Sequence, residues 1–429
     1  MPASLRERVA RCLVAATLFA SLPMATHAAV GDVVWTRGPE LGVARELHAA
    51  ASLASGEILV AGGEANSAFL ASAEVFSEPQ NAWTAVGSLV IPRDQHTLTR
   101  LEDGRILVAG GYGPTLYLSS AEIFDPATSA FTEIAPLAEA RLGHTATLLE
   151  DGRVLVVGGY GNHGVEASVE LFDPASNTWS DAPALAVGRN QHTATLLEDG
   201  RVLVAGGFDG NGGIGTTSIF DPATNTWSEG PALGTPRWLH AAIRMDDGSV
   251  LVVGGNDGAK ALASAERWTP PAASFEAIAP LTTPRFQPTA TALGDGRVLV
   301  AGGLDGTAAL DSAEVWSPEL GAWTDAGRLS APHFHHVAET LPSGAVLLAG
   351  GLDGQTPSAS VDVAAIQGPP PFLERTCGCS LIGARPESHA WLVVIAGLAL
   401  AACCRRARPG RSRRRGRRAC AGAPRRPWR

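Results

Sequence analysis

The sequence predicts an all-β protein, a β-propeller of seven four-stranded blades, from three observations. Gly-Gly doublets recur every 48 residues without one insertion, starting at Gly62, Gly110, Gly158, Gly206, Gly254, Gly302 and Gly350. A period near 50 residues is typical of propeller blades. An arginine, a histidine and an aromatic residue recur in the same phase. Short runs of Val, Ile, Leu and Ala, with 49 glycines, indicate many short strands and tight turns rather than long helices or disorder.

One repeat contains four strand patterns, and the third copy illustrates them. We expect His144–Leu149 to form the first strand and Arg153–Val157 the second, with an Asp-Gly turn between them. Ser168–Phe172 is the expected third strand, and Thr178-Trp179 begins the fourth. The second strand is apolar on both faces, which is typical of a strand packed between two layers. Each repeat is therefore predicted to form one blade.

The phase of the repeat also predicts how the ring closes. Residues 33–37 match a fourth strand, yet they precede the first repeat. The last repeat stops after its third strand, near Val363. The N-terminal strand should therefore become the outer strand of the last blade. Such closure removes free sheet edges, which would otherwise promote aggregation.

Polar residues that recur in the blades are interpreted as structural, because a binding site seldom needs one copy per blade. We expect the repeated arginines, histidines and glutamates to form hydrogen-bonded pairs within or between blades. The arginines and histidines are Arg45, Arg93, Arg141, Arg189, Arg237, Arg285, His48, His96, His144, His192, His240 and His336. A metal site is the alternative for the histidines, since His is a common ligand. Their period is that of the fold, however, and we predict no metal.

The repeat resembles the Kelch family, which has a Gly-Gly doublet after the second strand and then a spaced acidic and aromatic pair. The resemblance covers residues 31–365, and Ser218 replaces the acidic residue once. It implies a propeller of the type that also forms the central domain of galactose oxidase. The copper site of that enzyme needs a Tyr cross-linked to Cys, a second Tyr and His ligands. Residues 13–376 contain no Cys, and their tyrosines are Tyr112, Tyr117 and Tyr160, so we expect no copper radical chemistry.

Positions that differ between blades are better candidates for a ligand site. The two residues before the repeated histidine vary without any change of length. On innermost first strands they would ring one mouth of the central channel, with Trp238, Phe286 and Phe334 side by side. Aromatic faces beside amides and carboxylates suit a glycan or an extended peptide; alternatively, the aromatic side chains only plug the channel. The candidate residues are Asp94, Gln95, Asn190, Gln191, Trp238, Phe286, Phe334 and His335.

Both ends of the chain carry targeting patterns. Residues 1–28 are typical of a secretory signal peptide, with three arginines, an apolar run and small residues at a cleavage site. Residues 367–376 form a Pro-rich linker, and residues 377–429 contain Cys377, Cys379, an apolar run and an Arg-rich end. This end resembles myxobacterial surface-sorting signals, which implies a hydrophobic helix and processing or lipid attachment at one of the two cysteines by a sorting protease. A plain membrane anchor is the alternative.

Charge and motif content narrow the function further. Residues 30–376 hold 40 Asp or Glu against 16 Arg and one Lys, and so acidic a body argues against nucleic acid as a partner. No nucleophile elbow, phosphate-binding loop or zinc-ligand spacing is present. We predict an exported, monomeric propeller at residues 30–366, at the cell surface or released from it. It should bind a glycan or protein ligand without a cofactor; a carbohydrate-active enzyme on the same scaffold is the alternative.

Overall fold

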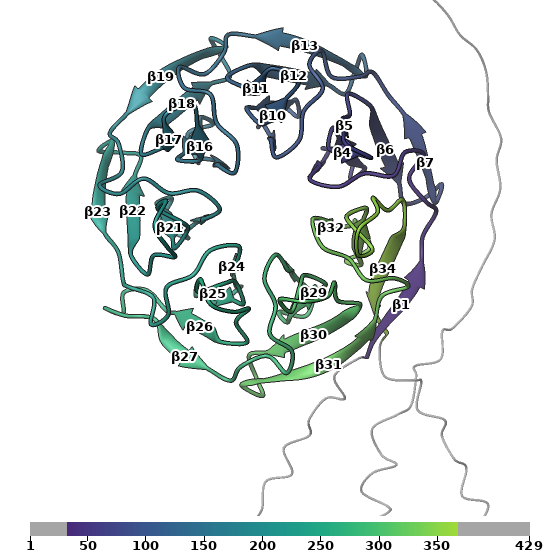
Figure 1. Ribbon diagram of the computed structural model, residues 1–429, viewed down its shortest axis with the longest axis vertical. Helices are drawn as coiled ribbons and strands as arrows, with labels where there is room; N and C mark the ends of the chain where they lie inside the picture. Colours follow the sequence, from purple (N-terminus) through teal and green to yellow (C-terminus); the bar gives the residue numbers. More distant parts are fainter. Residues whose placement is uncertain (1–31, 368–429) are drawn as a thin grey trace, which may run out of the picture. The chain divides into compact units, whose positions relative to one another are not determined.

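The computed structural model describes residues 32–367, in which seven four-stranded antiparallel sheets form a ring (Figure 1). In six of the sheets the chain runs outward, from the strand at the ring centre to the strand at the rim. This part of the chain contains no helix, and so none that could span a membrane. The predicted all-β, seven-bladed propeller is confirmed.

From the centre outward, blade 1 consists of β2 (Ala49–Ser52), β3 (Ile58–Ala61), β6 (Ala73–Ser77) and β7 (Ala82–Ala85). Blade 2 consists of β8 (Thr97–Arg100), β9 (Ile106–Ala109), β12 (Ala121–Asp125) and β13 (Ala130–Ile134). Blade 3 consists of β14 (Thr145–Leu148), β15 (Val154–Val157), β18 (Val169–Asp173) and β19 (Thr178–Ala182). Those of blades 4 and 5 are β20 (Thr193–Leu196), β21 (Val202–Ala205), β22 (Thr217–Asp221) and β23 (Thr226–Glu229); β24 (Ala241–Arg244), β25 (Val250–Val253), β26 (Ala265–Trp268) and β27 (Glu276–Ile278). Those of blades 6 and 7 are β28 (Thr289–Ala292), β29 (Val298–Ala301), β30 (Ser312–Ser317) and β31 (Ala322–Arg328); β32 (Val337–Thr340), β33 (Val346–Ala349), β34 (Val361–Ile366) and β1 (Val33–Arg37).

Blade 7 is closed by the N-terminal strand, as the phase of the repeat predicts. Strand β1 pairs antiparallel with β34, in a register that sets Val33 opposite Ile366 and Arg37 opposite Asp362. Trp35 packs into the hydrophobic cluster between blades 6 and 7, and its Nε1–H donates to the carbonyl of Ala326 at 2.6 Å. The two ends of the propeller are therefore joined by a complete strand pair.

The core lies between the blades rather than within them. The second strand of every blade is fully buried, since each of its faces packs on a neighbouring blade. Between blades 1 and 2, for example, Leu59 and Ala61 share a cluster with Ile106 and Val108. Burying a Val, Leu or Ile side chain stabilises the fold by about 1.5–3 kcal/mol. The doubly apolar strand pattern is thus explained by two-sided burial.

Polar groups lock each blade internally and to the next blade, as blade 2 shows. The guanidinium of Arg93 donates to the carbonyl of Gly110 at 2.8 Å and to the carboxylate of Glu122 at 2.8 Å. The N–H of Gly111 donates to the carbonyl of Arg141 in blade 3 at 2.8 Å. Gly110 has a φ of 61°, and a Cβ there would lie only 2.5 Å from that same carbonyl oxygen. The expected pairing of the repeated Arg and Glu is confirmed in five blades, and the glycines permit the blades to approach closely.

The predicted targeting elements lie outside the described residues. They are the signal peptide at residues 1–28, the linker beyond Gln367, the C-terminal hydrophobic helix, and the two sorting residues Cys377 and Cys379.

Candidate functional site

The candidate site is built on seven residues at which the chain enters the inner strands. Each has a positive φ, between 47° and 59°, and we call them the mouth ring: Leu47, Gln95, Gly143, Gln191, Leu239, Gln287 and His335. Their backbones bond from blade to blade, beginning with the Gln95 N–H, which donates to the Leu47 carbonyl at 2.9 Å. Four more bonds of this kind continue the chain of contacts to Gln287. The variable pairs singled out in the sequence therefore gather on one face of the propeller.

The residue before each mouth-ring position forms backbone hydrogen bonds with a second loop, which therefore lies on the same face. Asp94 and Tyr112 exchange two backbone hydrogen bonds of 2.9 Å, and Glu46 and Glu64 do the same at 2.9 and 3.0 Å. The loops held in this way connect the second and third strands. In blades 1 to 3 they are small hairpins: β4 (Glu64–Ala65) with β5 (Ala68–Phe69), β10 (Tyr112–Gly113) with β11 (Leu116–Tyr117), and β16 (Tyr160–Gly161) with β17 (Gly164–Val165).

The corresponding loops of blades 4 to 6 have a different chemistry. Each contains an aspartate whose carboxylate accepts the backbone N–H two residues later, at 2.7 to 2.9 Å: Asp209, Asp257 and Asp305. Such Asx turns use their carboxylates to hold the loop. The face therefore divides into a hairpin sector over blades 1 to 3 and a turn sector over blades 4 to 6.

Three carboxylates, which we call the acidic group, lie in the hairpin sector: Glu46, Glu64 and Asp94. Asp94 is only 2% exposed, and its Oδ1 atom has no hydrogen-bond partner among the described residues. Burial, together with the charges of Glu64 and Glu46, raises the pKa of Asp94 to about 7, against a hydrogen bond from Gln95. Near neutral pH this side chain can therefore donate or accept a hydrogen bond.

A side-chain contact joins the acidic group to the last blade. His335 Nδ1 lies 2.9 Å from the Oε2 atom of Glu46, so this pair links blade 7 to blade 1. The backbone bonds of the mouth ring stop on either side of His335 among the described residues. Burial lowers the pKa of His335, while the hydrogen bond and charge of Glu46 oppose that shift. The Glu46–His335 pair thus replaces the backbone contact at this junction.

Beside the acidic group lies a line of four half-buried rings, which we call the aromatic row: Phe69, Tyr112, Tyr117 and Tyr160. Successive centroids are 5.6, 5.5 and 5.7 Å apart, with interplanar angles of 53° to 67°. Such separations are those of attractive ring pairs. Asp94 is paired through the backbone with Tyr112, the second residue of the row, so the acidic group and the aromatic row are carried by neighbouring segments.

The other residues predicted for the site lie on the same face but do not form one patch. Gln95 and Gln191 belong to the mouth ring, and Asn190 is buried with an unpartnered Oδ1. Among the described residues no ring contact joins the remaining three aromatic side chains to one another. Instead, Trp238 packs on Phe208 at 5.3 Å, Phe334 packs on His335 at 4.7 Å, and Phe286 forms a backbone bridge with Leu304.

Several residues of this site were missed from the sequence, namely Glu46, Glu64 and the aromatic row. A usable signal was present, because all three tyrosines of the chain fall between residues 112 and 160. Glu46 also occupies the same repeat position as Asp94, 48 residues earlier. The clustering of tyrosines in two adjacent repeats marked the hairpin sector.

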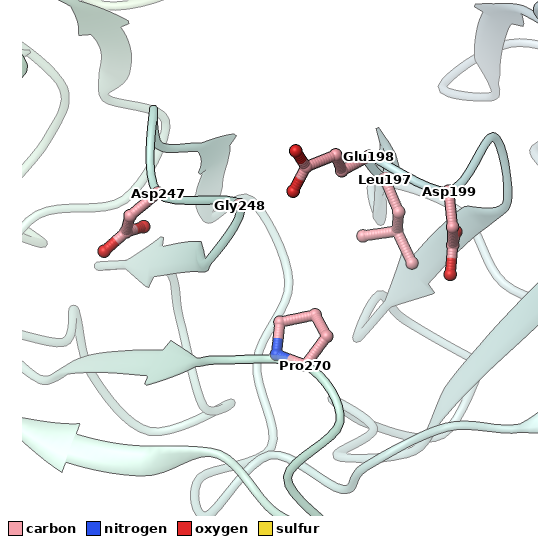
Figure 2. Close-up of a pocket in the computed structure, with 6 residues that line it drawn as sticks. All are labelled: Leu197, Glu198, Asp199, Asp247, Gly248 and Pro270. Carbon is pink, nitrogen blue, oxygen red and sulfur yellow. The ribbon is translucent and has the colours of Figure 1, made fainter.

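The opposite face carries pockets formed by the turns between first and second strands. Figure 2 shows one of them, between blades 4 and 5, lined by Leu197, Glu198, Asp199, Asp247, Gly248 and Pro270. Asp199 forms an ion pair with Arg201 at 2.6 Å, and Asp247 pairs with Arg267. These two carboxylates are already engaged in holding turns. We therefore place the candidate site on the mouth-ring face.

Family models match two stretches of the chain. One, described as the KLHDC2/KLHL20/DRC7 Kelch-repeats domain, matches residues 47–255, and the Kelch motif matches residues 285–330. These are Kelch repeats. The Kelch propeller of this chain continues them around the whole ring of seven blades. A comparison with curated proteins finds no match.

Solved structures share the fold of this Kelch propeller at low sequence identity. A fungal alcohol oxidase of the AA5 family, solved in complex with copper, is 18% identical, with 79% of this chain and 76% of that chain covered and a TM-score of 0.65. The protein YjhT is 15% identical, with 67% of this chain and 99% of that chain covered and a TM-score of 0.54. At these identities the likeness concerns the fold alone.

The described residues do not fit a copper site of the galactose-oxidase type. No three His, Cys, Asp or Glu side chains within residues 32–367 come together as a set of metal ligands. The same range contains no cysteine that could be cross-linked to a tyrosine. Its three tyrosines lie in the aromatic row, where they contact one another and Phe69. We therefore derive no chemistry through copper.

Proposed function

We propose that this Kelch propeller is an exported, surface-associated binding or adhesion module that recognises a glycan or protein ligand without catalysis. The observation that carries the proposal is the unpartnered Oδ1 atom of buried Asp94, a residue that pairs through its backbone with Tyr112 of the aromatic row. A buried polar atom without a partner costs about 1–3 kcal/mol, which a ligand donor can recover. The aromatic row offers the apolar surface that such a ligand also needs.

The charge of this sector favours ligands with hydroxyl, ammonium or guanidinium groups. Glu46, Glu64 and Asp94 supply acceptors on one side, and the rings of the aromatic row supply stacking surfaces on the other. Sugars present hydroxyl groups and apolar faces together, and a peptide with a basic side chain presents a comparable combination. Both ligand classes therefore suit the same group of residues.

Binding screens with the purified chain test this function, first against immobilised glycans and then against peptides with basic residues. Asp94→Asn should raise the dissociation constant about tenfold or more, because a hydrogen bond to a charged group contributes about 1.5–3 kcal/mol. Tyr112→Ala should raise it about two- to tenfold, because an aromatic contact contributes about 0.5–1.5 kcal/mol. Leu304→Ala, at the repeat position of Tyr112 in blade 6, is the matched control and should bind as the wild type does. Unchanged binding in a folded Asp94→Asn, Tyr112→Ala double variant would refute this site.

A second candidate is a carbohydrate-active enzyme, and the raised pKa of Asp94 favours it. A carboxyl group with a pKa of about 7 beside other carboxylates has the ionisation expected of a general acid. Incubation with each bound glycan, followed by analysis of the products, separates the two functions. Conversion that is lost in Asp94→Asn supports the enzyme, whereas binding without conversion supports the module.

Export and surface attachment rest on the terminal patterns of the sequence. The proposal predicts cleavage after the segment 1–28 and processing or lipid attachment at Cys377 or Cys379. Mass spectrometry of the mature chain, with separate analysis of the membrane and culture fractions, checks both ends. An intact N-terminus on a soluble intracellular chain would contradict export. It would not bear on the ligand site, which the binding screens test.

A further inference from the structure

The buried Arg–Glu pair of the Kelch repeat is present in five blades and incomplete in blade 4. In the five blades the guanidinium and carboxylate lie 2.5 to 3.0 Å apart. Blade 7 replaces both partners, with His333 and Asp362 in their places, 3.5 Å apart. Only blade 4 keeps the arginine, Arg189, while losing the carboxylate, because Ser218 occupies the acidic position.

The carboxylate that blade 4 lacks has three donors in the complete blades. In blade 3, Glu170 accepts from the guanidinium of Arg141 at 2.6 Å. It also accepts from two successive backbone N–H groups of the loop before that arginine, Ala138 at 2.7 Å and Glu139 at 3.3 Å. The same three contacts recur in blades 1, 2, 5 and 6. The glutamate thus neutralises the cation and holds the loop.

In blade 4 the donors remain without that acceptor. Arg189 is only 1% exposed, and its guanidinium donates to the carbonyls of Gly206 and Thr216 and to the Thr216 hydroxyl. It has no ion-pair partner among residues 32–367, and the backbone N–H groups of Ala186 and Val187 find no acceptor there. Burial alone lowers the pKa of Arg189 to about 10. A desolvated cation without a counter-ion is strongly unfavourable.

The missing group is small and has a definite shape. Beyond the Cβ atom, serine has one hydroxyl where glutamate has a methylene and a carboxylate. The volume that Ser218 leaves unfilled is therefore close to that of one carboxylate. Ser218 is also partly exposed, whereas the five equivalent glutamates are buried, so solvent reaches this position. We propose that blade 4 binds a small free carboxylate anion between the guanidinium of Arg189 and the backbone N–H groups of Ala186 and Val187. This site is independent of the proposed function.

Formate is the matching probe, because it consists of a carboxylate and one hydrogen. Thermal unfolding of the full chain is followed by tryptophan fluorescence as sodium formate replaces sodium isethionate at constant ionic strength. The wild-type Tm should rise with formate, by about 2 °C or more once formate exceeds its dissociation constant tenfold. Ser218→Glu supplies the carboxylate internally, so its Tm should be higher without formate and should no longer respond to it.

The repeat provides a reciprocal control in blade 3. Glu170→Ser should lower the Tm and create a second site, so that formate restores part of the loss and gives a larger total response than in the wild type. A wild-type Tm that is independent of formate overturns the proposal, as does a full formate response in Ser218→Glu. If Glu170→Ser does not fold, the wild-type and Ser218→Glu titrations still decide the question.

Discussion

The six repeated histidines should make the propeller sensitive to mild acid. All six are buried at the junctions between blades: His48, His96, His144, His192, His240 and His336. Four of them are hydrogen-bonded through Nε2 to a threonine of the preceding blade at 2.9 to 3.1 Å. Burial lowers the pKa of every one, and lowers that of His144, His240 and His336 to about 3, with nearby arginines or histidines adding to the shift. The folded protein therefore holds these rings neutral.

The loss of stability follows from the difference in protonation between the two states. An unfolded histidine titrates near pH 6.5, so below that pH the unfolded chain binds protons that the folded chain excludes. Stability is then present above pH 6.5 and falls as the pH decreases toward 3. Between pH 7 and pH 5, each histidine with a folded pKa of about 3 lowers the free energy of unfolding by about 2 kcal/mol. The three histidines of this kind together lower it by about 6 kcal/mol. Such a loss is comparable with the 5–15 kcal/mol stability of a typical domain.

Two carboxyl groups act in the opposite direction over this range. Burial raises the pKa of Asp94 and of Glu339, so the folded state takes up protons at these side chains as the pH falls. These two carboxyl groups offset part of the loss, but they oppose the six repeated histidines and His335, whose pKa burial also lowers. We therefore expect a net decrease in the free energy of unfolding from pH 7 to pH 5.

Urea unfolding at a series of pH values, followed by tryptophan fluorescence, measures this decrease. His240→Gln removes one titrating group and should reduce the loss between pH 7 and pH 5 by about 2 kcal/mol. His163 lies on an exposed loop, and His163→Gln is the matched control. A wild-type stability that changes by less than about 1 kcal/mol over this range would refute the reasoning.

Three further substitutions, the first with a matched control, test the fold. Gly110→Ala should lower the free energy of unfolding in urea by about 2 kcal/mol or more, because the new Cβ would lie 2.5 Å from the Arg141 carbonyl oxygen. Gly321 has a similar φ but open space around it, so the control Gly321→Ala should cost only about 1 kcal/mol. Trp35→Ala should cost about 2 kcal/mol by urea unfolding and expose blade 7 to proteases first, by removing a half-buried side chain that packs on the cluster between blades 6 and 7. Glu122→Gln leaves Arg93 buried without its charged partner and should cost about 3–5 kcal/mol; a loss below 1 kcal/mol would contradict the assigned pairing.

The fold was predictable because the repeat supplied phase as well as period. The segment 33–37, expected as a fourth strand, is strand β1, and the strands expected in the third repeat agree with β14, β15, β18 and β19 within one residue at the start. Every blade packs on neighbours of the same sequence pattern, so local and tertiary preferences agree at each position. The fold predicted for one repeat therefore applied to every blade of the ring.

The candidate site was only partly predictable, because it depends on contacts between blades. The variable positions before the repeated histidine were found from their lack of symmetry, and Asp94 was among them. The surroundings of Asp94 depend on Tyr112, a backbone partner 18 residues later, and on the charge of Glu64 in the neighbouring blade. The hairpins that align the aromatic row replace Asx turns without any change of length, so the spacing of the repeat gave no sign of them.

Several departures from sevenfold symmetry lie where the two ends of the propeller meet. Val337 and Ala49 occupy the position of the threonine that contacts the next histidine in four other blades, and the mouth ring loses its backbone bonds at His335. Side-chain contacts act across this junction instead, through Glu46–His335 at 2.9 Å and Glu339–Ser52 at 2.8 Å. Blades 7 and 1 are also joined by a shared apolar cluster and by the backbone bond from the Gly351 N–H to the Arg45 carbonyl at 2.8 Å, and the same junction adjoins the acidic group. Glu46 belongs to both the junction and the acidic group, since it contacts His335 and its charge raises the pKa of Asp94. A ligand that neutralises Glu46 should therefore lower the pKa of Asp94 and weaken the junction contact in the same step.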